Sequence, residues 1–277
     1  MSDPLAEFTG TVVDPRINPE AANELADRLT RSDVPLMPPL PADTVMLPGG
    51  YLDEDGLLHT EARIREINGS DEEAMARELR SPTMNIPKVV DLIVKRCVLS
   101  VGELESTPKL LAQMLTGDRA ALMLAIRILT FGTEWEVPDF PCRICSQTFG
   151  TIVELDTTIE IRKMKNPKVQ DIEVELRNGH LALVHLLTGA VQLEMVGDGN
   201  RTGPEEATIA IDRSIRSIDG NPVTGHVAQK MSMADRRKII QAMSDQQPGP
   251  RLEEVMVTCS ECGREADYQI SLVDLFR

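Results

Sequence analysis

The sequence predicts an α+β fold: two tandem repeats of short strands and helices, related by a pseudo-twofold axis and preceded by an extended arm. Three observations predict it. The pair Cys142/Cys145 recurs 117 positions later as Cys259/Cys262. Strand-like and helix-like patterns recur around both pairs in the same order. The first 46 residues differ from the rest because prolines interrupt them. The expected divisions are therefore an arm (1–46), a first repeat (47–160) and a second repeat (161–277).

The arm is predicted to contain one short helix and an extended segment. Asn18 and Pro19 suit the N-cap and the first turn of a helix that covers 19–29. A proline-rich run follows, and its spacing prevents a helix or a central strand and favours extended, polyproline-like chain. Its prolines are Pro35, Pro38, Pro39, Pro41 and Pro48. We expect the arm to become ordered against a partner.

The first repeat reads as a strand, three helices and a second strand. Alternating apolar residues predict a strand over 57–67. Ser70 and Glu73 have capping-box spacing, which predicts the start of a helix there. Two more helices are predicted, over 86–98 and over 117–132 with Gly132 as its end. The first cysteine pair follows, and after it a short strand over 151–155.

The second repeat follows the same order. A strand is predicted over 180–189, helices over 204–218 and 233–243, then the second cysteine pair and a closing segment over 268–275. The offset of 117 also relates Pro87 to Pro204, Leu155 to Leu272, and the pair Asp118-Arg119 to Asp235-Arg236. We infer an internal duplication. The two Asp-Arg pairs are interpreted as helix caps plus an ion pair between repeats, with partner binding as the alternative.

The duplication suggests how the cysteines are used. If the pseudo-twofold axis brings the two pairs together, Cys142, Cys145, Cys259 and Cys262 can hold one tetrahedral Zn²⁺ with Zn–S distances of about 2.3 Å. Four sulfur ligands leave no open position, so this zinc would be structural, one per chain. The alternatives are metal-free thiols, redox disulfides and an iron–sulfur cluster. Strand-like sequence after each pair disfavours redox chemistry, and nothing else suggests electron transfer. Cys97 is interpreted as a small buried side chain.

Composition disfavours several classes of protein. The net charge is −15 and aromatic residues make up only 3% of the chain. Such a chain is a poor partner for nucleic acid or an anionic membrane surface. Neither a signal peptide nor a membrane-spanning segment is predicted, so we expect a cytosolic protein. The sequence also contains no phosphate-binding glycine loop and no histidines at the spacing of metal ligands. We therefore expect no enzymatic activity and no small-molecule substrate. The histidines are His59, His180, His185 and His226.

Three features occur in order along the chain: "LPGG" at 47–50, the Gly-Asp-Arg helix that ends in Phe-Gly (117–132), and "CRICSQTFGTIVEL" (142–155). In this combination residues 46–277 resemble the baseplate hub assembly proteins of contractile-tailed bacteriophages. It implies a non-enzymatic structural or assembly protein of a phage-like tail baseplate, in the virion or in the host cytoplasm during assembly. The implied partners are other tail proteins: tape measure, hub, tube-initiating or wedge components.

A zinc-ribbon-type nucleic-acid or transcription adaptor is the alternative function. It would need a basic face near the cysteines, where Arg143 and Arg264 lie. Acidic residues surround these two arginines in sequence and favour the tail protein instead. They are Glu134, Glu136, Glu253, Glu254, Glu261 and Glu265.

Overall fold

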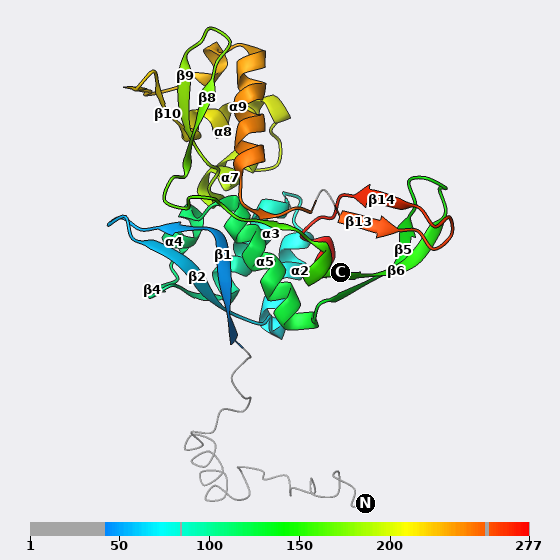
Figure 1. The fold of residues 1–277 in the computed structure, drawn as a ribbon. Helices are drawn as coiled ribbons and strands as arrows, with labels where there is room; N and C mark the ends of the chain where they lie inside the picture. Colours follow the sequence, from blue (N-terminus) through cyan, green and yellow to red (C-terminus); the bar gives the residue numbers. More distant parts are fainter. Residues whose placement is uncertain (1–41, 84, 253–254, 277) are drawn as a thin grey trace, which may run out of the picture. The chain divides into compact units, whose positions relative to one another are not determined.

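The computed structural model describes residues 42–83, 85–252 and 255–276 (Figure 1). The predicted helix at 19–29 and most of the proline-rich run lie outside the described residues. Residues 42–46, which the sequence pattern assigns to the arm, form the first part of strand β1 (Ala42–Leu52). The chain mixes helices and strands, so the predicted α+β class is confirmed.

The first half combines an antiparallel sheet, a group of helices and a separate hairpin. The sheet has the order β1-β2-β3-β4, and α2 and α3 connect its two central strands. The hairpin β5–β6 carries the first cysteine pair at its turn. In chain order the elements after β1 are β2 (Leu58–Arg65), α2 (Gly69–Leu79), α3 (Ile86–Cys97), β3 (Val98–Val101), β4 (Leu104–Glu105), α4 (Pro108–Gln113), α5 (Thr116–Phe131), β5 (Glu134–Pro141), β6 (Thr148–Glu154) and α6 (Leu155–Thr158).

The second half has the same plan. Its sheet has the order β8-β9-β10-β11, and the hairpin β13–β14 carries the second cysteine pair. In chain order its elements are β7 (Ile161–Arg162), β8 (Asp171–Glu175), β9 (Leu181–His185), α7 (Gly189–Val196), α8 (Gly203–Ser214), β10 (Ile215–Ile218), β11 (Asn221–Pro222), η1 (Ala228–Lys230), α9 (Met233–Gln246), β12 (Gly249–Pro250), β13 (Val255–Thr258), β14 (Glu265–Tyr268) and η2 (Asp274–Phe276).

Many elements of the two halves correspond residue by residue. Helices α3 and α8 have 12 residues each and start 117 positions apart. The pairs β3/β10 and β4/β11 also start and end 117 positions apart. Earlier in each half the offset is 120: Ala62 pairs with Val101 in one sheet, and Ala182 pairs with Ile218 in the other. Helix α7 has 8 residues where α2 has 11, and this shortening by three residues accounts for the difference, because the connections to α8 and α3 are equally long.

Three hydrophobic clusters hold the described residues together. One lies between the first sheet and α3 and α5, and includes Ile64 and Val94. Another lies between the second sheet and α8 and α9, and includes Ile211. The third joins the two hairpins to each other and to α5, through side chains such as Trp135 and Val255. Burial of apolar surface in this third cluster, at about 25 cal/mol per Å², favours bringing the two cysteine pairs to one place.

Several predicted boundaries were wrong for identifiable reasons. Asn68, not Ser70, caps α2, because its side chain accepts from the backbone N–H groups of Ser70 and Asp71. The helix predicted over 204–218 ends at Ser214, since residues 215–218 form strand β10, which pairs with β9. The strand predicted over 180–189 ends at His185, and Thr188 caps α7. Helices α3, α5 and α9 agree with their predictions, and Gly132 (φ 86°) ends α5 as expected.

Candidate metal centre

Each cysteine pair sits in a tight turn at the tip of a hairpin, and the two turns are built alike. In the first, Cys142 N donates to Gln147 O (2.8 Å) and Ser146 N donates to Cys142 O (3.0 Å). In the second, Cys259 N donates to Arg264 O (3.0 Å) and Gly263 N donates to Cys259 O (2.9 Å). Ser146 (φ 61°) and Gly263 (φ 66°) are both left-handed. Both turns therefore have the same backbone conformation, although only one has glycine at the left-handed position.

The four sulfur atoms form one compact group. All of them lie within 4.8 Å of one another. The Cys142 and Cys262 sulfurs are 3.8 Å apart, and the Cys145 and Cys259 sulfurs are 3.9 Å apart. A tetrahedral ion with metal–sulfur distances of about 2.3 Å has sulfur–sulfur edges of about 3.8 Å. The measured separations thus match a tetrahedral S₄ site, and both of these close contacts join one hairpin to the other.

Aromatic side chains support the sulfur group from one side. Phe140 packs against Tyr268 with ring centroids 4.4 Å apart and against Phe149 at 5.7 Å. The Tyr268 hydroxyl accepts from Arg143 N (3.3 Å), and the Arg143 guanidinium lies 5.3 Å from the centre of the Tyr268 ring. One of the two arginines considered for nucleic-acid binding is thus engaged with a tyrosine of the other hairpin.

The backbone favours thiolate at one cysteine, and burial opposes it at another. The N–H groups of Cys145 and Ile144 each point at Cys142 Sγ (3.4 Å), and these hydrogen bonds lower the pKa of Cys142 to about 6. Burial raises the pKa of Cys259. Four neighbouring thiolates repel one another, and a divalent cation between them removes that repulsion. Sulfur-only, tetrahedral donor sets suit zinc, so the residues present fit this ion.

A family model described as T4 bacteriophage base plate protein matches residues 52–277. That span includes both hairpins and all four cysteines. The chain belongs to the T4 bacteriophage base plate protein family. A search of curated proteins and a search of solved structures returned no match. None of the described helices of this base plate protein is both long enough and apolar enough to span a bilayer.

The histidines of the base plate protein lie apart from the sulfur group, and each pairs with a carboxylate. His59 contacts Asp53 (3.0 Å), and His226 contacts Asp212 (3.0 Å). The remaining pairs are His185 with Asp171 and His180 with Asp219. Cys97 is fully buried in the first cluster, and burial raises the pKa of its thiol to about 11. Cys97 therefore has the environment of a structural side chain.

The two Asp-Arg pairs were interpreted as helix caps plus an ion pair between repeats, and the structure differs on both points. Arg119 forms its ion pair with Asp91 (2.8 Å) in its own half, so the predicted ion pair between repeats is wrong for this residue. Asp118 accepts from Gly49 N (2.7 Å), and its burial raises its pKa to about 7. At the start of α9, Asp235 accepts hydrogen bonds from the Ser232 hydroxyl and from the backbone N–H of Arg177, which follows β8. Only the Asp235 carboxylate acts as part of a helix cap.

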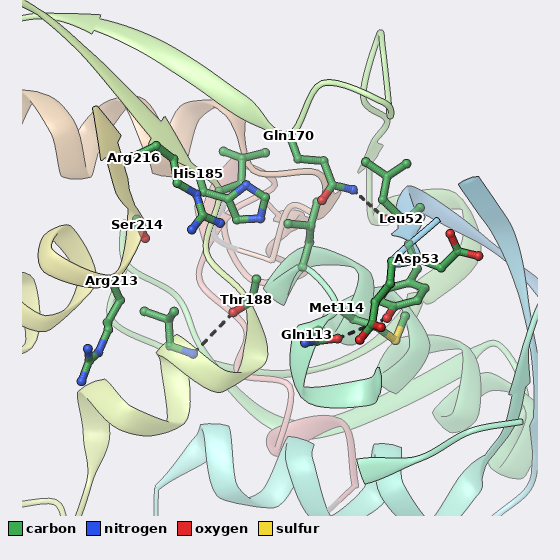
Figure 2. A pocket seen from close by; sticks show the side chains of 16 residues that line it. Leu52, Asp53, Gln113, Met114, Gln170, His185, Thr188, Arg213, Ser214 and Arg216 are labelled. Carbon is green, nitrogen blue, oxygen red and sulfur yellow. Dashed lines mark hydrogen bonds between the residues drawn. The ribbon is translucent and has the colours of Figure 1, made fainter. Parts of the chain in front are cut away.

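A cleft of about 390 Å³, which the sequence patterns did not predict, lies between β1 and α4 of the first half and β9, α7 and β10 of the second (Figure 2). Gln170 Nε2 donates to Gly50 O (3.0 Å) across it, and Tyr51 donates to Gln113 Oε1 (3.2 Å) within its wall. Ser214 lines the cleft, but its hydroxyl has no partner among the described residues, so it forms no pair with His185. Ser214 is the counterpart of Cys97, and both are fully buried.

Proposed function

We propose that this base plate protein is a non-enzymatic structural or assembly component of a phage-like contractile tail, in which one structural zinc ion joins the two copies of a duplicated unit. The observation that carries the proposal is the group of four cysteine sulfurs, two from each hairpin, at tetrahedral spacing. Membership of the base plate family supports a place in the virion tail or in its assembly in the host.

The correspondence between the halves supports duplication, with the first unit over 47–160 and the second over 161–277. Hydrogen bonds of equivalent arginine side chains follow the same offset as the elements. Arg119 donates to Leu111 O (2.7 Å) and to Asp91, whereas Arg236 donates to Ala228 O (3.3 Å) and to the Thr208 hydroxyl. Both pairs of acceptors are 117 positions apart. Two copies of one ancestral unit are expected to share both the order of their elements and their side-chain contacts.

A closed S₄ site gives zinc a mechanical role. With four protein ligands the ion has no position for water or substrate, so it stabilises the fold and performs no chemistry. Structural zinc contributes on the order of 10 kcal/mol in small zinc-dependent domains. Because each hairpin supplies two ligands, losing the ion removes one link between the hairpins and leaves only their side-chain packing. A hairpin pair fixed in this way offers other tail proteins a rigid surface.

The partners we propose are other tail proteins, namely tape measure, hub or wedge components. The family assignment supports the class of partner. The N-terminal arm is proposed to be one of the segments that bind them, because its proline-rich sequence suits extended binding to another chain.

The proposal is tested by metal analysis of purified full-length protein. We expect one zinc ion per chain by inductively coupled plasma mass spectrometry, and no iron. Cys142→Ser and Cys259→Ser should each lose the ion and lower the melting temperature, because each removes one of four ligands. Cys97→Ser, a buried cysteine outside the group, is the matched control and should keep the zinc. If either ligand variant keeps both its metal and its melting temperature, the shared site is wrong.

A further inference from the structure

An open groove runs between α8 and α9 on the second half. Its volume is about 670 Å³, and Pro204, Ala207 and Ile240 form part of its apolar wall. Met233, also in the wall, is 68% exposed and adds apolar surface to the groove. Arg236 and Arg237 add positive charge to a molecule whose net charge is −15. The groove therefore combines apolar surface with local basic charge.

The corresponding surface of the first half is covered by the second half. Residues 114–116 at the start of α5 lie against residues 187–189 at the start of α7. Thr116 N donates to Leu187 O (2.8 Å), and Gly189 N donates to Met114 O (2.9 Å). These two hydrogen bonds fix the start of α7 on the groove between α3 and α5, and α7 also contacts α3. The first groove thus shows what kind of segment fits: an extended residue followed by a helix that starts with glycine.

Glycine is required at that contact. A Cβ on Gly189 would lie 2.6 Å from Cδ and Cζ of Arg119, which forms the floor of the first groove. Arg119 is 1% exposed beneath α7. Arg236, its counterpart with matching hydrogen bonds, is partly exposed in the second groove. The second groove therefore has an equivalent arginine at its floor, but no described segment covers it as the start of α7 covers Arg119.

The counterpart of the covering segment is the start of α2. Asn68 caps α2 as Thr188 caps α7, 120 positions apart, and Gly69 stands where α7 has Gly189. A Cβ on Gly69 would meet nothing within 4 Å, so nothing nearby in the described chain requires a glycine there. Two exposed acidic residues, Glu72 and Glu73, follow on this helix. They complement Arg237 of the second groove, whose counterpart in the first groove is uncharged Ala120.

We propose that the groove between α8 and α9 binds the start of α2, residues 67–73, of a second copy of this chain. Within one chain, the start of α7 binds the groove of the first half. The proposed contact is the equivalent one between two chains. It rests on the duplication in the proposed function. Groove and helix lie on different parts of the chain, so the contact is head-to-tail. An assembly of any length then has a free groove at one end and a free α2 at the other. Such contacts build a ring where the rotation closes and a filament where it does not.

Sedimentation velocity of the full-length, zinc-containing protein over a concentration series tests the contact. Wild type should self-associate. Gly69→Ala adds a Cβ to the binding face of α2, and Arg237→Glu reverses a charge in the groove wall. Each should weaken association roughly tenfold or more. Lys238→Glu makes the same charge change at the next, exposed position outside the groove wall and is the matched control. It should associate as wild type does.

Mixing the two defective variants makes the test specific. Gly69→Ala keeps an intact groove and Arg237→Glu keeps an intact α2, so an equimolar mixture should form a one-to-one heterodimer that grows no further. A monomeric wild type, a Lys238→Glu variant as defective as Arg237→Glu, or a mixture that stays monomeric would each overturn the proposal. In the monomeric case, loss of another tail protein's binding in Arg237→Glu would identify that protein as the occupant. Zinc content, measured on the same samples, tests the metal site separately.

Discussion

The contact between α7 and Arg119 can be tested by adding one methyl group at each of two equivalent glycines. Gly189→Ala places a Cβ within 2.6 Å of two Arg119 carbons, well inside van der Waals contact. Gly69→Ala is the same change at the corresponding helix start, where the new Cβ has no neighbour within 4 Å. The two variants differ only in whether another part of the chain lies over the glycine.

The magnitude follows from what Arg119 must give up to move. Its guanidinium donates to Leu111 O (2.7 Å) and Asp91 Oδ1 (2.8 Å), and it has no exposed space to enter. A hydrogen bond that involves a charged group contributes about 1.5–3 kcal/mol, and loss of a buried one adds a desolvation cost. Alanine in place of glycine in a helix returns about 0.5–1 kcal/mol. We therefore expect Gly189→Ala to destabilise the fold by about 2–4 kcal/mol and Gly69→Ala to stabilise it by up to about 1 kcal/mol.

Urea denaturation followed by far-ultraviolet circular dichroism measures both free energies of unfolding. The protein concentration should be low enough for self-association to be negligible, because binding between folded copies adds apparent stability. All samples should have the same metal content. If the two alanine variants shift the midpoint equally, or if Gly189→Ala is as stable as wild type, α7 does not rest on Arg119 as described.

Three further substitutions each probe a single residue. Burial raises the pKa of Asp118 from 3.8 to about 7, so the folded state holds this proton more tightly than the unfolded state. Its contribution to stability is complete below about pH 4 and falls as the pH rises to about 7, by on the order of 4 kcal/mol. Asp118→Asn should remove this dependence, and the stability difference between variant and wild type, measured by urea denaturation from pH 5 to 8, should change with pH. A constant difference would contradict the raised pKa. Ser146→Gly should raise the melting temperature, because a left-handed non-glycine residue costs about 1–2 kcal/mol, and Gly263→Ser should lower it similarly; opposite or absent shifts would show that the two turns are not equivalent.

The grouping of the four cysteines could be predicted from sequence because its signal is local and occurs twice. Cysteines three positions apart, each pair between strand-like stretches, indicate a turn of the kind found in zinc sites, which depends little on the rest of the fold. The second pair at a constant offset then completes a set of four candidate ligands. Helices α3 and α5 were also predictable, since Pro87 and Gly132 mark an end of each and their apolar residues repeat with helical spacing.

The elements that could not be predicted depend on contacts between distant residues. Strand β1 follows a proline-rich run and contains Pro48, yet it lies at the edge of its sheet, where a missing N–H costs little. Strand β10 continues an apolar helical pattern, and its pairing with β9 and β11 makes it a strand. The partner of Arg119 is Asp91, 28 positions earlier, and no spacing rule indicates it.

The repeated dipeptide Asp-Arg illustrates why equal sequence need not mean equal environment. Asp118 and Arg119 are both buried, whereas Asp235 and Arg236 are partly exposed. The dipeptides are identical; the difference is that the start of α7 covers Arg119, while the groove over Arg236 is open among the described residues. If the two halves are copies of one unit, as we propose, and each copy is covered by the next through this surface, the last copy is left uncovered. In a base plate, where protein chains assemble on one another, an uncovered last copy is a natural place for the next chain to bind, and the variants at Gly69 and Arg237 test that explanation directly.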